Sequence, residues 1–191
     1  MWQKNIGLGI NMNITDEEMQ DYFPTTFPKM FVGQYGGIAV GKGWFNILRV
    51  LCQSIQWHLD WSIKNNKWDL EYNEMITEHL AGDSTKLDKY CGTGTWAEER
   101  RAEILEQGLK EPRPIVQQVV IEQVKEKFGS LRFYYQGGDE YISGLVSMAE
   151  SMAGITCETC GDAGEGRNGG WIRTLCDKHE AEYQAKRKEN D

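Results

Sequence analysis

The feature that most constrains this chain is a set of metal-binding side chains near its C-terminus. Cys157, Cys160, Cys176 and His179 form a C-x2-C-x15-C-x2-H pattern. Zn²⁺ prefers four nitrogen or sulfur ligands in a tetrahedron, and structural zinc sites commonly take two of them from a Cys-x-x-Cys turn. Gly161 directly follows the second cysteine and suits the left-handed backbone of such a turn. We therefore predict that these four side chains bind one zinc ion.

The composition of the ligand set predicts a structural rather than a catalytic metal. Three thiolates and one imidazole complete a tetrahedron, whereas catalytic zinc usually keeps one position open for water. The stretch "WIRTL" before the third ligand has the pattern of a strand, and a helical pattern follows that ligand. This order, a cysteine knuckle, a glycine-rich hairpin and a helix that carries the last two ligands, resembles the treble-clef class of zinc modules. The alternative is that the four groups are unrelated.

The remaining cysteines and the N-terminus predict a cytosolic protein without disulfides. Cys52 and Cys91 are left over as free thiols, with Cys52 buried in a helix and Cys91 more reactive in a polar loop. The N-terminal residues show no signal-peptide pattern. Nowhere do 18 consecutive apolar residues occur, so no membrane span is expected.

A long amphipathic helix is the strongest secondary-structure signal. Apolar residues recur at three- and four-residue steps between residues 44 and 63, which predicts a helix over 43–65 with one buried face. Val50, Trp57 and Trp61 add a second apolar stripe. This helix is expected to pack on two sides or to offer tryptophans to a partner.

Shorter patterns predict the other elements of an α+β fold. Residues 115–124 are rich in β-branched side chains, and "LRFYYQ" follows an "FGS" turn, which indicates a hairpin. Residues 140–153 show a helical stripe, and 38–40 a short strand. A capping box of Thr15 and Glu18 predicts a short helix that Pro24 stops. We expect a small antiparallel sheet or hairpin packed by the long helix, with the treble-clef-like zinc module at the C-terminus.

The predicted domain organisation has two parts. Residues 1–155 form an α+β core domain with a helical insert at 66–114, and residues 156–191 form a zinc-binding module packed on that domain. In the insert, "EYNEMITEHL" and "TWAEERRAEILEQG" read as helices, the second opened by a capping box of Thr95 and Glu98. The stretch "DSTKLDKYCGTGT" between them reads as a loop.

The chain shows no recognisable catalytic constellation. If His179 binds metal, only His58 and His79 remain for general acid or base chemistry, and neither has a partner that the sequence reveals. A weak candidate for ligand binding is a set of cations that could grip a phosphate if the fold brought them together: Lys125, Arg132, Arg167 and Arg173.

The charge balance disfavours nucleic acid as a partner. The chain has 21 Lys and Arg against 29 Asp and Glu, a net charge of −8. The predicted zinc module alone, residues 157–191, has six basic against eight acidic residues. Such surfaces repel a phosphate backbone.

Several stretches resemble a family of small proteins found in tailed phages and prophages. The most specific are "VVIEQVKEKFGSLRFYY" and "CETCGDAGEGRNGGWIRTLCDKH", and "FPKMF" and "GKGWFNILRVLCQSIQWHLDW" also match. Lys42 stands where an acidic residue is expected in relatives. The family has no assigned function, so the resemblance implies a phage context and no mechanism.

These observations lead to one main functional expectation and two alternatives. The main expectation is a non-enzymatic, zinc-stabilised phage accessory protein that binds and modulates a host protein, by inhibition, in the host cytoplasm. A component of host defence is one such target. The alternatives are a nucleic-acid-binding regulator, and a protein or enzyme that binds a nucleotide or other small ligand through clustered Arg and Lys.

Overall fold

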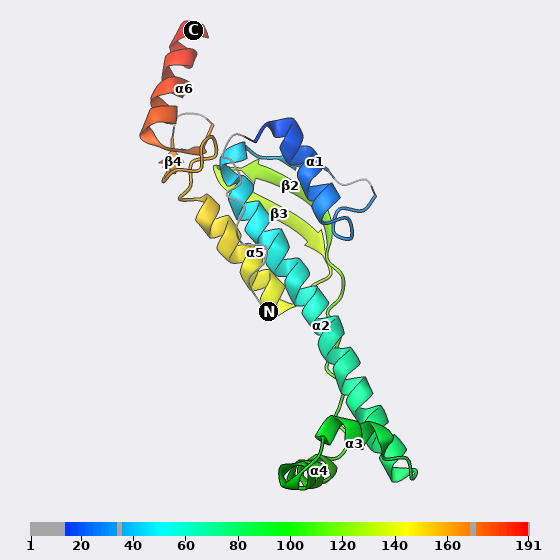
Figure 1. The fold of residues 1–191 in the computed structure, drawn as a ribbon. Coiled ribbons are helices and arrows are strands. Elements are labelled where there is room, and N and C mark those ends of the chain that lie inside the picture. Colours follow the sequence, from blue (N-terminus) through cyan, green and yellow to red (C-terminus); the bar gives the residue numbers. More distant parts are fainter. Residues whose placement is uncertain (1–13, 34–35, 169–170, 191) are drawn as a thin grey trace. The chain divides into compact units, whose positions relative to one another are not determined.

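A computed structural model describes residues 14–33, 36–168 and 171–190 of the chain. The chain divides into two compact units, one of residues 1–56 and 117–191 and the other of residues 57–116. The fold is α+β, as predicted, with a long helix and small sheets (Figure 1). Within the described residues, no helix has the length and apolar character that crossing a membrane requires.

The first unit is built on a three-stranded sheet with the order β1-β2-β3. Strands β2 (Val120–Lys127) and β3 (Ser130–Gln136) form the predicted antiparallel hairpin. β1 (Ile38–Ala39) adds a short parallel strand beside β2. The hairpin turn consists of Phe128 and Gly129, both with positive φ (55° and 73°), a geometry that matches the twist of two antiparallel strands.

The buried face of the hairpin does not alternate evenly. A register shift between Ile121 and Gln123 allows Ile121 and Val124, three residues apart, both to be buried. On β3 the ordinary alternation holds, since Leu131 and Phe133 are both buried. The expected strand at 115–124 begins only at residue 120, because the preceding residues run as extended chain without strand partners in the described structure.

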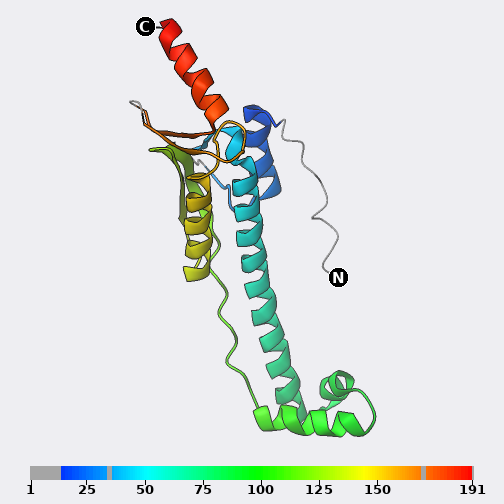
Figure 2. The same cartoon turned by 90° about the vertical axis from the view of Figure 1, so that its left-hand side faces the viewer.

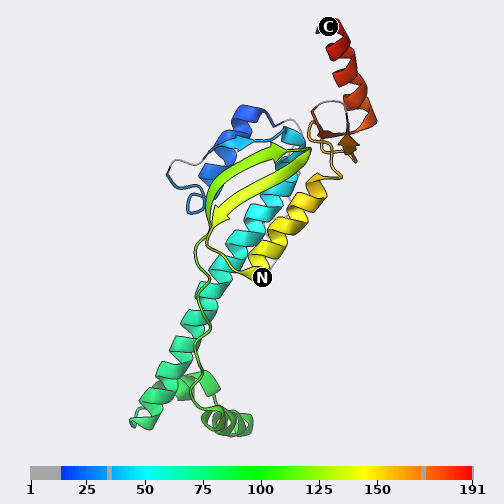
Figure 3. The same cartoon turned by 180° about the vertical axis from the view of Figure 1, so that it is seen from behind.

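Helices α2 (Phe45–Leu80) and α5 (Glu140–Ala153) cover this sheet. Seen from behind, the sheet lies in front of α5 and of the N-terminal part of α2 (Figure 3). The apolar stripe of α5 is buried at Ile142, Val146 and Ala149. Asp139 caps α5 by accepting a hydrogen bond from the backbone N–H of Ile142 (3.0 Å), which satisfies one of the free N–H groups of the first turn.

Helix α1 (Asp16–Thr26) has the predicted capping box of Thr15 and Glu18. The prediction that Pro24 stops this helix is wrong, because the helix continues to Thr26. Proline removes one hydrogen bond to the preceding turn and crowds that turn, but it does not prevent the two residues after it from being helical. Burial of Phe23, whose ring packs edge-on against Phe45 of α2 (5.6 Å between centroids), holds the helical backbone at this point.

The C-terminal part of the first unit has little regular structure before its last helix. Strands β4 (Glu165–Arg167) and β5 (Arg173–Leu175) pair antiparallel, and α6 (Asp177–Asn190) follows (Figure 2). The part of this stretch that the structure describes before α6 buries few side chains, among them Cys157, Thr174 and Leu175.

The second unit consists of the C-terminal part of α2 with α3 (Thr85–Cys91) and α4 (Thr95–Gln107). The predicted end of the long helix near residue 65 is wrong, since α2 is continuous to Leu80. The apolar stripe fades there because the buried positions are polar. Ser62, Asn65 and Asp69 are buried here. The side chains of Ser62 and Asp69 accept hydrogen bonds from the extended segment that follows α4, and the backbone carbonyl of Asn65 accepts one from Arg113 Nη2 (3.4 Å).

Two further expectations for this unit are corrected. The supposed loop after α2 contains α3, and Cys91 is fully buried in an apolar cluster with Leu87 and Ile104. Cys91 is therefore not a reactive loop thiol. The helix that was expected to start at a Thr95 cap is instead preceded by Gly94, without a side-chain cap, because Thr95 already belongs to the helix.

Candidate metal centre

The structure brings the four predicted ligands together. One ligand atom from each of Cys157, Cys160, Cys176 and His179 lies within 4.8 Å of all the others. The two sulfurs of Cys160 and Cys176 are 3.9 Å apart. His179 Nδ1 is 3.5 Å from Cys157 Sγ and 3.2 Å from Cys176 Sγ. This cluster can hold a metal ion.

The first two ligands come from a tight turn. The backbone N–H of Gly161 donates to the carbonyl of Cys157 (2.8 Å), and the N–H of Cys157 donates to the carbonyl of Asp162 (2.7 Å). Gly161 has φ +84°, the left-handed backbone expected of it. Cys160 therefore turns back towards Cys157 over only two intervening residues.

The last two ligands stand at the start of α6. Cys176 directly follows β5, and its carbonyl accepts a hydrogen bond from the N–H of Glu180, which begins the helix (3.0 Å). His179 lies in the first turn, with Nδ1 facing the sulfurs and Nε2 3.9 Å from a carboxylate oxygen of Glu182. A carboxylate on the far side of the ring favours the tautomer whose Nδ1 is free to bind a metal. Glu182 was not predicted, although its place three residues after a ligand histidine is a readable signal.

Backbone dipoles favour negative charge at the buried cysteine. Burial acts to raise the pKa of Cys157, but hydrogen bonds from the backbone of Cys176, Cys160 and Thr159 outweigh it and hold that pKa below its ordinary value. Burial raises the pKa of Cys160 to about 12. A bound cation must therefore displace a proton from the Cys160 thiol.

The cysteine turn is fixed to the rest of the first unit by backbone contacts. The N–H of Gly43 donates to the carbonyl of Glu158 (2.8 Å), and the indole N–H of Trp44 donates to the carbonyl of Thr156 (2.7 Å). At Gly43 an added Cβ would lie 2.2 Å from the carbonyl oxygen of Cys157. The contact therefore requires glycine at position 43 for lack of space.

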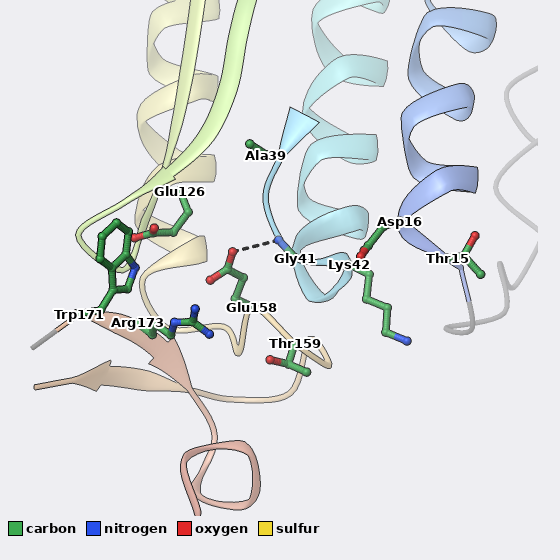
Figure 4. Close-up of a pocket in the computed structure, with 10 residues that line it drawn as sticks. All are labelled: Thr15, Asp16, Ala39, Gly41, Lys42, Glu126, Glu158, Thr159, Trp171 and Arg173. Carbon is green, nitrogen blue, oxygen red and sulfur yellow. Dashed lines mark hydrogen bonds between the residues drawn. The ribbon is translucent and has the colours of Figure 1, made fainter. Parts of the chain in front are cut away.

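A polar cleft of about 600 Å³ adjoins this contact (Figure 4). The Glu158 side chain lies within it and accepts a hydrogen bond from the N–H of Gly41 (2.9 Å). Burial, together with the nearby Glu126, raises the pKa of Glu158. Lys42 and Arg173 supply positive charge in the same cleft. Its described lining has mixed charge and contains no histidine or cysteine.

The four cations proposed from sequence do not meet at one site. Lys125 and Arg132 are cross-strand neighbours on the hairpin, and Arg132 pairs with Glu150 (3.5 Å). Arg167 and Arg173 are cross-strand neighbours on β4 and β5. Arg173 also lines the polar cleft, whereas neither Lys125 nor Arg132 does.

Local partners already engage these cations. Lys125 lies over the ring of Tyr134 (5.1 Å) and Arg173 over that of Tyr183 (4.9 Å). Arg167 pairs with Glu165 (2.7 Å) and with Asp177 (2.6 Å). The last pair fixes β4 to the first turn of α6. These contacts support the framework around the metal cluster more directly than they support a phosphate site.

The two remaining histidines stand apart from the metal cluster. His58 and His79 both belong to α2 in the second unit. His79 Nδ1 lies 2.8 Å from the hydroxyl oxygen of Ser84. This contact joins the end of α2 to the loop that follows it.

The chain matches no protein-family model, no curated protein and no solved structure.

Proposed function

We propose that the protein is a non-enzymatic accessory protein, stabilised by zinc, that works by binding another protein. The phage-like stretches of its sequence further suggest that it is phage-encoded, that it acts in the host cytoplasm and that its target is a host protein, which it inhibits. The observations that support the proposal are four potential metal ligands within 4.8 Å of one another and, in the same unit, an exposed apolar groove. In this proposal the metal stabilises the fold, and the groove binds the partner protein.

The spacing of the four potential ligands supports a tetrahedral zinc site. Zn–S bonds of about 2.3 Å and a Zn–N bond of about 2.05 Å in a tetrahedron separate sulfurs by about 3.8 Å, and sulfur from nitrogen by about 3.6 Å. The corresponding separations here are 3.9 Å for Cys160 to Cys176 and 3.5 and 3.2 Å for the two sulfurs nearest to His179. Three soft thiolates also favour zinc over Mg²⁺ or Ca²⁺.

The metal is proposed to be structural. Four protein ligands complete the tetrahedron, so no position remains for a water or a substrate. Their order along the chain, a turn, the β4–β5 hairpin and then α6, supports the proposal of a treble-clef-like module. The described residues that line the nearby polar cleft do not include a nucleophilic side chain paired with a general base. Activity that depends on chemistry at the metal is therefore not expected.

The proposed contact surface is an apolar groove of about 210 Å³ between α2 and α5 in the first unit. Val50, Met148 and Met152 line it and remain 45–55% exposed. Exposed apolar grooves commonly mark protein interaction sites, and methionine side chains adapt readily to different partners. An amphipathic helix of the partner, with its apolar face in the groove, is the occupant that this shape favours.

Of the alternatives, nucleic-acid binding has less support. The net charge is −8, and the candidate cations are engaged in ion pairs or over aromatic rings, so they present no continuous basic surface. Binding of this kind would require release of counterions from many phosphates. A small-ligand site built from those four cations is disfavoured for the same reason, since they lie in two separate pairs.

Affinity capture with matched variants tests the proposal. Tagged wild-type protein, Met148→Glu in the groove and Leu80→Glu as an exposed control outside it would be incubated with lysate of the bacterial host. Leu80 is 73% exposed, so its replacement should be harmless. We expect one host protein to be retained by wild type and by Leu80→Glu, and lost with Met148→Glu. Equal capture by all three proteins would contradict the groove as the contact surface. If no protein were captured, the proposed binding of a host protein would be contradicted.

A further inference from the structure

The second unit contains a surface cavity of its own, unrelated to the metal cluster. It has a volume of about 490 Å³, within the range of small-molecule sites. Its lining combines aromatic rings and charged groups from α2, α3 and the segment after α4: Trp68, Tyr72, Tyr90, Lys110, Glu111 and Arg113, with Asp69 beneath Arg113.

Two bidentate contacts fix the cationic side of this cavity in place. Asp69 accepts hydrogen bonds from Nε, Nη2 and the backbone N–H of Arg113 (2.7, 2.8 and 3.0 Å). The Asn73 amide both accepts from the backbone N–H of Lys110 (2.9 Å) and donates to its carbonyl (2.7 Å). A segment that has neither helix nor strand is thus held rigidly along α2, a form of preorganisation that favours binding.

Positive charge remains available in the cavity. Lys110 Nζ lies 3.9 Å over the ring of Tyr72 and makes no ion pair with any described residue. Arg113 binds Asp69 through Nε and Nη2, which leaves Nη1 without a partner among the described residues, and its side chain is 51% exposed. An ammonium and one edge of a guanidinium together suit an anionic group such as a phosphate.

The rest of the lining suits a planar ring. Trp68 is 51% exposed, so it can offer ring surface to a ligand. Tyr90 is 39% exposed, and because Arg100 lies over one face of its ring (4.9 Å), it offers a ligand the opposite face. Nucleobases stack on such aromatic side chains with little dependence on which base is present. Glu111 adds a carboxylate that can accept hydrogen bonds from hydroxyl or amino groups.

From this combination we infer that the cavity binds a nucleoside monophosphate, with the base on Trp68 or Tyr90 and the phosphate at Lys110 and Arg113. A cationic ligand in an aromatic cage is the competing idea for such a lining. The ammonium of Lys110 already occupies the face of Tyr72 and would repel a second cation. This inference does not depend on the proposed binding of a protein partner, because the groove belongs to the other unit.

Titration of the full-length protein with AMP, GMP, CMP and UMP, followed by calorimetry and by the indole N–H signals in ¹H–¹⁵N spectra, tests the inference. We expect saturable binding of at least one nucleotide, with a shift of the Trp68 signal and little change at Trp57. Lys110→Gln should weaken binding at least about tenfold, as loss of a charge-assisted hydrogen bond does. Lys67→Gln is the control, since Lys67 pairs with Glu71 and does not line the cavity.

Separate arms identify which part of the ligand is recognised. The nucleoside and inorganic phosphate should each bind at least about tenfold more weakly than the nucleotide. Trp68→Leu should weaken binding, whereas Trp57→Leu should not, and circular dichroism would show that all variants remain folded. The inference is overturned if none of the four nucleotides saturates the protein at millimolar concentration, or if binding is the same in Lys110→Gln and Trp68→Leu as in wild type.

Discussion

The predicted zinc-binding module (residues 156–191) and the second unit each contain a stretch of chain with little regular structure. The two stretches are held in place by different means. The described residues between 157 and 179 contain two three-residue strands and include four potential metal ligands that lie close together. Residues 109–116 contain neither helix nor strand, and polar side chains of α2 hold them, chiefly through the Asp69–Arg113 pair. On the proposed function, the first stretch depends on a bound ion, whereas the second is held by partners within its own unit.

This difference predicts two separable responses. Loss of the metal should disorder residues 157–179 and leave the second unit intact, because the contacts that hold the second unit are made by its own residues. Loss of the Asp69–Arg113 pair should do the reverse. The following variants test the two halves of the comparison in order of expected effect.

The largest effect is expected from Cys157→Ser. Cys157 is fully buried in the cluster, and a structural zinc contributes roughly 10 kcal/mol of apparent folding free energy. The variant should lose its metal, measured by elemental analysis, and most of that stabilisation, measured by urea unfolding. Cys52→Ala is the matched control: Cys52 is equally buried, burial raises its pKa so that it stays a neutral thiol, and it lies outside the cluster. It should keep one metal per chain; equal metal loss in both variants would contradict the assignment.

Gly43→Ala should have the next largest effect. The new Cβ would meet three backbone atoms of the cysteine turn at 2.2–2.6 Å, and overpacking against a backbone that cannot yield costs about 3 kcal/mol. Thermal unfolding and metal affinity should both fall. Gly144→Ala is the control, because its Cβ meets nothing within 4 Å on α5, and it should raise stability by up to about 1 kcal/mol. If Gly43→Ala had the same stability and metal affinity as Gly144→Ala, the close contact between the cysteine turn and Gly43 would be contradicted.

A smaller, pH-dependent effect is expected from Asp69→Asn in the second unit. Hydrogen bonds from the Arg113 side chain, and then from its backbone, lower the pKa of Asp69 to about 2, against about 3.9 in an unfolded chain. The ionised carboxylate therefore stabilises the fold above pH 4, and this stabilisation is lost as the pH falls from about 4 to about 2. The difference in unfolding free energy between wild type and Asp69→Asn should shrink over that interval. A difference independent of pH would mean that the pair is not what holds the segment.

The cluster of four potential metal ligands could be predicted from sequence because the spacing of the residues is typical of metal-binding pairs. C-x2-C and C-x2-H pairs bring two ligands together over one turn each, and Gly161 marks the backbone that such a turn needs. The hairpin was predictable for a similar reason, since its turn and its alternating side chains are local. Both features depend on residues that are close in the chain.

The second unit was predicted less well because its contacts, both polar and apolar, join residues that are distant in sequence. Asp69 and Arg113 are 44 residues apart, and nothing near either residue indicates the partner. Ser62 and Asn65 are buried although their residue types are usually exposed, so the apolar period that defines a helix face stops before the helix does. Cys91 was misplaced for the same reason: the apolar cluster that buries it is assembled from three helices.

Hydrogen exchange of the full chain, followed peptide by peptide with and without a zinc chelator, tests the central claim most directly. The account predicts that the chelator removes protection from residues 157–179 while residues 57–116 keep theirs. Readdition of zinc should restore the protection. The claim is that the metal stabilises residues 157–179 and not residues 57–116. It would be contradicted if residues 157–179 stayed protected in protein shown to have lost its metal, or if both regions lost protection together.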